Sequence, residues 1–219
     1  MIINDYILKE IKPLTSKNTV KEARNLCRNL PVTHVLIVEE NRLIGCFSES
    51  DIQTLEDKSK TLSSISYLLN HFHATKETTL LELIKLFADN NCNVISVLDK
   101  KQNYLGYYEL SDVLDVFTDS PFLYHENETL IVEKDVKDFS MSEVAQIVET
   151  NKGVLKGMFI SSETTQKVQV NLQIVSEEIN EIIQTFRRYE YHVVTVHEDD
   201  FYLEDLKNRS EYLQKYLDI

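Results

Sequence analysis

One phrase occurs twice in this chain of 219 residues, as RLIGCFSESDI at residues 42–52 and as NYLGYYELSDV at residues 103–113. The glycines Gly45 and Gly106 lie 61 residues apart, and so do the aspartates Asp51 and Asp112. The whole chain has only four glycines, so this matched placement indicates a repeat. Each glycine is expected to mark a point where the backbone passes close to another segment or where a side chain does not fit.

The repeat extends upstream of these phrases. Residues 19–23 match residues 79–83, and the apolar run at 35–38 matches 95–98, both at an offset of 60. One extra residue near Lys100 moves the offset to 61, as expected of an insertion in a turn. Each copy reads as helix, strand, turn, strand and helix, and a further helix is predicted at 61–69. Residues 1–118 are therefore predicted to hold two βαββα-type repeats, at about 1–58 and 59–118.

A different pattern begins after residues 118–121, where Pro121 and its polar neighbours indicate a domain boundary. Residues 122–200 give the element order βαββαβ. Within them, Ser140 and Glu143 predict a capping box at the start of a helix, and residues 167–175 alternate between apolar and polar as a strand does. Residues 201–219 have leucines at helical spacing and predict a C-terminal helix. The predicted fold class is mixed α/β.

Composition excludes several classes of function. The formal net charge of −13 argues against a nucleic-acid partner, because acidic surfaces repel phosphate backbones. No apolar run approaches the roughly 20 residues of a membrane helix, so no membrane association is expected. Three cysteines in apolar segments and the absence of a signal peptide favour a cytoplasmic protein. The chain has no phosphate loop and no hydrolase or zinc-protease motif, so neither catalysis nor a metal site is predicted.

The repeated phrase resembles the CBS domain. Gly45-x-x-Ser48-x-x-Asp51 matches that family's Gly-apolar-apolar-Ser/Thr-x-x-Asp/Asn segment, and residues 31–38 are similar to the stretch that precedes it. Two such repeats would form a tandem CBS pair, or Bateman module. The βαββαβ part looks like an ACT domain, with a ferredoxin-like fold. The whole layout resembles the CBS–CBS–ACT arrangement of the acetoin utilisation protein family.

This resemblance implies a non-catalytic regulatory protein that senses an adenine nucleotide, with AMP, ADP or ATP as the regulatory ligand and no cofactor required. In CBS pairs that bind adenosine nucleotides, the motif serine helps to hold phosphate and the motif aspartate accepts hydrogen bonds from ribose hydroxyls. A carboxylate can accept hydrogen bonds from both hydroxyls of a vicinal diol. The nucleotide-binding residues implied in this way are Ser48 and Asp51 in the first repeat, Asp112 in the second, and His34, Val35, Asn93 and Val94 beside the base.

Other interpretations of the same residues stay open. Ser48 and Asp51 also read as a helix cap, which alone would explain both. In the second repeat Glu109 stands where serine or threonine is expected, and its carboxylate would repel phosphate. The alternative to a nucleotide sensor is therefore a structural protein–protein interaction module whose clefts are empty.

The ACT-like part is expected to assemble a homodimer rather than to bind an amino acid. Its first strand and helix are joined by residues 137–140, which lack the glycine usual in ligand-binding ACT domains. The protein regulated by this homodimer is not identified by the sequence.

Overall fold

The computed structural model describes residues 3–124, 126–195 and 212, and the chain divides into two compact units, Met1–Thr118 and Asp119–Ile219. The C-terminal helix predicted at 201–219 lies outside the described residues, apart from Tyr212. Among the helices of the described ranges, none combines the length and apolar character needed to cross a bilayer.

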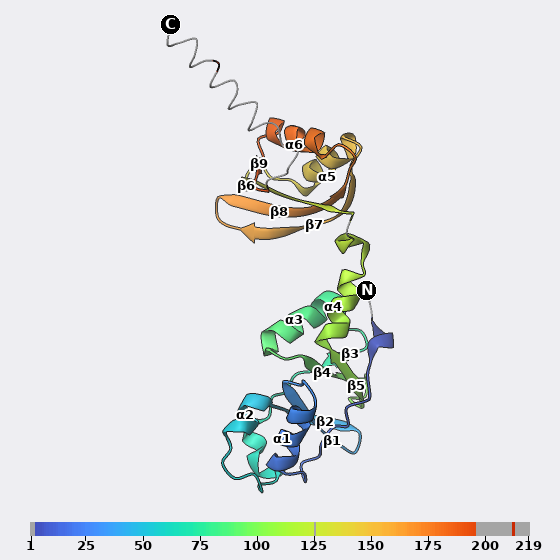
Figure 1. Cartoon of the computed structure of the whole chain (residues 1–219), viewed down its shortest axis with the longest axis vertical. Helices are drawn as coiled ribbons and strands as arrows, with labels where there is room; N and C mark the ends of the chain where they lie inside the picture. Colours follow the sequence, from blue (N-terminus) through green and yellow to red (C-terminus); the bar gives the residue numbers. More distant parts are fainter. Residues whose placement is uncertain (1–2, 125, 196–211, 213–219) are drawn as a thin grey trace. The chain divides into compact units, whose positions relative to one another are not determined.

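The first unit contains two copies of one arrangement, in which a helix precedes an antiparallel strand pair and a second helix follows it (Figure 1). After the 3₁₀ turn η1 (Asn4–Tyr6), the first copy comprises α1 (Val20–Asn29), β1 (His34–Glu39), β2 (Arg42–Ser48) and α2 (Glu49–Thr54). The second comprises β3 (Ala74–Thr75), α3 (Leu80–Asn90), β4 (Val94–Leu98), β5 (Tyr104–Glu109) and α4 (Leu110–Thr118). The helix predicted at 61–69 is the 3₁₀ segment η2 (Leu62–Leu68), which has a kink at Ile65, where the backbone is not helical.

The first helix of each copy begins with the same local device. Thr19 and Thr79 are the N-caps of α1 and α3, and each forms a capping box with the glutamate three residues later. The backbone N–H of Thr19 donates to Glu22 over 2.6 Å, and that of Thr79 to Glu82 over 2.7 Å. These boxes pair orphan amide groups at both helix starts, so equivalent residues begin equivalent helices.

Gly45 and Gly106 lie on strands that are crossed by a segment of the other repeat. Leu8, ahead of the first copy, exchanges backbone hydrogen bonds of 2.8 and 3.0 Å with Tyr107 of β5. Asn70, ahead of the second copy, exchanges bonds of 2.8 and 2.9 Å with Cys46 of β2. We call residues 7–8 and 69–71 the crossing segments. They tie the two repeats into one unit.

The crossing segments explain the glycines. A Cβ on Gly106 would lie 2.3 Å from the carbonyl oxygen of Leu8, and a Cβ on Gly45 would lie 2.9 Å from that of Asn70. Both glycines also have positive φ angles, +148° and +155°, that other residues rarely adopt. The prediction that these glycines mark close backbone approaches is confirmed.

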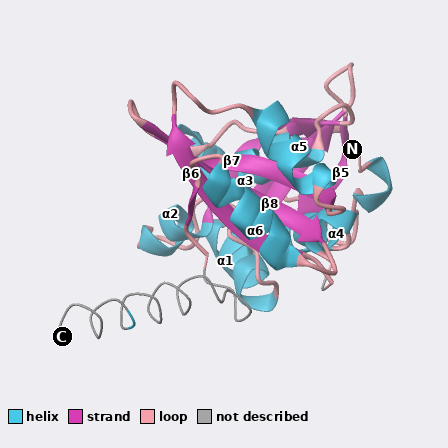
Figure 2. Ribbon diagram, turned by 90° about the horizontal axis from the view of Figure 1, so that it is seen from above, coloured by secondary structure: helices cyan, strands magenta, loops and turns pink. Residues whose placement is uncertain are grey.

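The second unit has the element order βαββαβ. After the 3₁₀ turn η3 (Pro121–Leu123), it comprises β6 (Glu128–Asp135), α5 (Met141–Thr150), β7 (Val154–Glu163), β8 (Lys167–Val175), α6 (Ile179–Arg188) and β9 (His192–Val193). The strands form an antiparallel sheet in the order β7-β8-β6-β9. Figures 1 and 2 show α5 and α6 together over one face of this sheet. This is the ferredoxin-like arrangement, and the predicted α/β class is confirmed.

The alternation of β8 places its apolar side chains in the core of the second unit. Val168, Val170, Leu172 and Ile174 are buried, and they pack in one cluster with residues of α5 and α6. The polar residues between them are of intermediate exposure. A strand that covers a core on one face shows this period of two.

The capping box predicted at Ser140 is wrong. Ser140 is the N-cap of α5 but makes no side-chain capping bond. The Glu143 carboxylate instead accepts hydrogen bonds from Lys134 Nζ at 2.7 Å and from the Tyr191 hydroxyl at 2.8 Å. The Lys134 side chain is only 10% exposed, and a buried ammonium needs an anionic partner. Lys134 also holds the pKa of Glu143 below its usual value.

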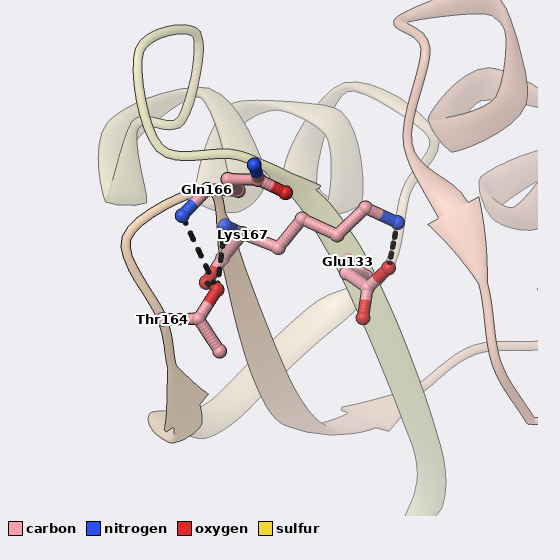
Figure 3. A network of polar contacts seen from close by, with 4 residues as sticks. All are labelled: Glu133, Thr164, Gln166 and Lys167. Carbon is pink, nitrogen blue, oxygen red and sulfur yellow. Dashed lines mark hydrogen bonds and ion pairs between the residues drawn. The ribbon is translucent and has the colours of Figure 1, made fainter.

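The turn between β7 and β8 is ordered by the polar contacts in Figure 3. Thr164 Oγ1 accepts hydrogen bonds from the backbone N–H groups of Gln166 and Lys167, at 3.3 and 3.0 Å. Lys167 Nζ then reaches Glu133 of β6 at 2.5 Å, and this carboxylate raises the pKa of Lys167. The ion pair joins β8 to β6 and is partly exposed, with side chains 54% and 24% exposed, so it contributes little to the stability of the fold.

Candidate functional site

A polar cleft of about 390 Å³ lies in the first unit and draws on both repeats. The first repeat supplies the residues before β1 and around the start of α2, and the second supplies the segment before β3 and the end of α3. The lining residues are Thr33, His34, Ser48, Glu49, Ser50, Asp51, Asn70, Asn90 and Asn91.

Ser48 and Asp51 enter the cleft as the first turn of α2. Ser48 is the N-cap, and its Oγ accepts a hydrogen bond from the Asp51 N–H at 3.0 Å. The same hydroxyl donates to Asp51 Oδ2 at 2.7 Å. Ser48 and Asp51 therefore do form the helix cap that the sequence suggested. A carboxylate has about four lone-pair sites, so this bond leaves Asp51 the capacity to accept from a ligand.

His34 forms a wall of the cleft at the start of β1. Its side chain is 7% exposed and meets the Phe72 ring edge-on, with 5.4 Å between ring centroids. Its Nδ1 lies 3.0 Å from the Thr33 hydroxyl. Burial lowers the pKa of His34, while the nearby Asp51 carboxylate opposes that shift. The ring is therefore mainly neutral at pH 7, and with Nδ1 engaged by Thr33 it leaves Nε2 to donate to or accept from a ligand.

The repeats meet beside the cleft through Thr33 and Asn93, which are 60 residues apart and occupy equivalent positions. The Thr33 N–H donates to Asn93 Oδ1 at 2.8 Å, and the Asn93 N–H donates to Thr33 Oγ1 at 2.9 Å. Asn93 Nδ2 also donates to the Pro31 carbonyl at 2.5 Å. This reciprocal pairing fixes the wall that carries His34.

Comparison with protein families identifies the repeated architecture. The model of the family described as "CBS domain" matches residues 3–56 and 69–119, one segment for each repeat. The first unit is a tandem CBS pair. Such pairs are regulatory modules and are typically non-catalytic.

Individual relatives of the CBS pair are distant. The uncharacterized protein MJ0188 of Methanocaldococcus jannaschii is 21% identical over 112 residues, which are 51% of this chain and 42% of that protein. The chain therefore matches less than half the length of that curated relative.

Similar solved structures also cover about half of the chain. One is a CBS domain pair/ACT domain protein of Thermotoga maritima, TM0892, with a TM-score of 0.48, 16% identity and coverage of 54% of this chain and 98% of that chain. Another is CBSX2 in complex with AMP, with a TM-score of 0.46, 15% identity and coverage of 53% and 95%. The cytosolic domain of the Mg²⁺ channel MgtE, in complex with ATP, has a TM-score of 0.44, 25% identity and coverage of 52% and 48%.

The structure brings only some of the predicted site residues of the CBS pair together. His34, Ser48 and Asp51 line the cleft, and Asn93 supports it through Thr33. Val35 and Val94 are each 1% exposed and belong to the hydrophobic core. Asp112 lies in the first turn of α4 and does not line this cleft. A ligand-binding role for these residues stays a prediction.

Sequence analysis missed the other lining residues of the cleft. Asn70, Asn90 and Asn91 come from the second repeat, so a motif confined to the first repeat carries no sign of them. Asn91 has one local signal, because it ends α3 in the left-handed conformation that asparagine tolerates. Glu49 lies inside the repeated phrase, but it has no counterpart in the family pattern.

Arg24 also escaped the sequence analysis, although it holds the helix that carries the cleft residues. Its side chain is 8% exposed and donates to the backbone carbonyls of Ile52, Gln53 and Leu55 at 3.1, 2.9 and 2.5 Å. These carbonyls lie at the C-terminal end of α2, where helical acceptors lack partners. The sequence did carry one sign of this role, because Arg24 is a charged residue on the apolar stripe of α1, between Ala23 and Cys27.

Proposed function

We propose that the CBS pair is a sensor that binds one adenosine-containing ligand in this cleft. The observation that carries the proposal is that Asp51, His34 and three asparagines line one cavity built by both repeats. Asp51 can accept from a ribose diol, and the imidazole and amides can pair with a base edge. Binding would then favour one arrangement of the protein over another, to the extent that affinity for the two differs.

The second candidate is an interaction module whose clefts hold no ligand. The mutual hydrogen bonds of Ser48 and Asp51 favour it, because helix capping alone accounts for both side chains. The two candidates differ in whether small molecules stabilise the protein.

A thermal-shift screen separates these candidates. Adenosine, AMP, ADP and ATP are added to the full chain, and at least one is expected to raise the melting temperature with increasing concentration. Asp51→Ala should abolish this rise. Asp115→Ala, which removes an exposed carboxylate of α4 outside the cleft, should preserve it. If none of the four compounds shifts wild-type protein at millimolar concentration, the interaction module is the better account.

We further propose that the chain forms a homodimer through the ACT-like unit, and that an unidentified partner protein responds to it. β7 forms one edge of the sheet and exposes Val154, Phe159 and Ile160 by 52%, 48% and 41%. Edge strands with apolar side chains favour pairing with another chain, and closed two-fold dimers are the commonest assembly.

Light scattering tests this assembly. Wild-type protein is expected at about twice the 25.5 kDa chain mass. Ile160→Lys should shift it towards the monomer, because a charge on the edge opposes pairing. Tyr67→Lys, at a side chain 76% exposed in the other unit, serves as the control and should leave the dimer intact. A monodisperse wild-type monomer at micromolar concentration would contradict the proposal.

A further inference from the structure

The charge of the cleft is opposite to what a phosphorylated ligand requires. Glu49 and Asp51 contribute two carboxylates, and no lysine or arginine is among the residues described as lining it. His34 adds no full positive charge at neutral pH, since burial lowers its pKa. Like charges in a partly enclosed site repel more strongly than in water.

Two of the first three backbone N–H groups of α2 also have partners within the protein. The Glu49 N–H donates to the Thr33 carbonyl at 2.8 Å, and the Asp51 N–H donates to Ser48 Oγ at 3.0 Å. Helix starts bind phosphate through free N–H groups. With these two donors occupied, only the Ser50 N–H of the first three is left to offset the repulsion from Glu49.

From these two observations we propose that Glu49 determines the specificity of the cleft, and that it selects an adenosine ligand with an uncharged 5′ end over its phosphorylated forms. This inference rests on the proposed function and adds the ligand class. It assigns to Glu49 a role in rejecting phosphate, whereas Asp51 contacts the part of the ligand that all these compounds share.

Calorimetric titration of the full chain tests the selectivity. At low ionic strength adenosine is expected to bind about tenfold more tightly than AMP, and AMP more tightly than ATP without magnesium. The differences should shrink as salt is added, because screening weakens repulsion between partly exposed charges.

Glu49→Gln removes the carboxylate and keeps a side chain of similar size. It is expected to raise the affinity for AMP about tenfold relative to adenosine. Glu56→Gln serves as the control, since Glu56 is exposed and outside the cleft lining, and it should leave the wild-type preference unchanged.

Two results would overturn the inference alone: wild-type protein that binds AMP as tightly as adenosine, or a Glu49→Gln variant with the wild-type ratio. Failure of every adenosine compound to bind wild-type protein would instead refute the proposed function together with this inference.

Discussion

Replacing Gly106 with alanine is expected to destabilise the CBS pair by about 3 kcal/mol or more. The new Cβ would lie 2.3 Å from the Leu8 carbonyl oxygen and 2.6 Å from Ile7 Cγ2. The carbonyl is backbone, and Leu8 is held by two hydrogen bonds to Tyr107, so it has little room to move. The φ of +148° adds strain for any residue with a side chain.

Gly45→Ala provides a graded comparison for the Gly106 prediction. Its Cβ would meet the Asn70 carbonyl oxygen at 2.9 Å. The backbone must move less to relieve this clash than the one at Gly106, so the loss of stability should be smaller. Urea unfolding of both variants, followed by circular dichroism, measures the order. An unaltered midpoint for Gly106→Ala, or a larger loss for Gly45→Ala, would contradict the role given to the crossing segments.

Arg24→Met should cost about 3 kcal/mol of folding stability. Methionine fills the apolar part of the arginine site but donates no hydrogen bond. The carbonyls of Ile52, Gln53 and Leu55 would then lose the donor they share. They would also lose the positive charge that stabilises the end of α2.

Arg28→Met is the matched control for this substitution. Arg28 lies one turn further along α1 and is exposed, so its replacement should change stability by no more than about 0.5 kcal/mol. Thermal unfolding of the two variants side by side gives the comparison. Equal losses would show that Arg24 acts through general charge rather than through the carbonyls of α2.

Local patterns predicted the repeat and its elements because their causes lie within a few residues. Thr19 with Glu22, and Thr79 with Glu82, form the capping boxes that begin α1 and α3. The alternation at residues 167–175 corresponds to the strand β8. Gly45 and Gly106 were correctly interpreted as close approaches, but the partner segments were not identifiable. Leu8 and Asn70 lie far away in sequence and contribute mainly backbone atoms to these contacts.

The departures from prediction arise from tertiary contacts. Glu143 has the spacing of a capping residue, yet the buried Lys134 recruits its carboxylate. Val35 follows His34, which lines the cleft, and Val94 follows Asn93, which supports it, but both valines belong to the hydrophobic core. Asn70, Asn90 and Asn91 reach the cleft only because the two repeats pack together. The motif of one repeat therefore predicts only the residues that this repeat contributes to the cleft.

The account depends most on one ligand occupying the cleft of Asp51. Calorimetric titration of the full chain with adenosine should give one site per chain, since Asp112, the repeat equivalent of Asp51, does not line this cleft. Binding should be lost in Asp51→Ala and kept in Asp112→Ala, its repeat equivalent. Two equal sites per chain, or binding that survives Asp51→Ala and disappears in Asp112→Ala, would contradict the account.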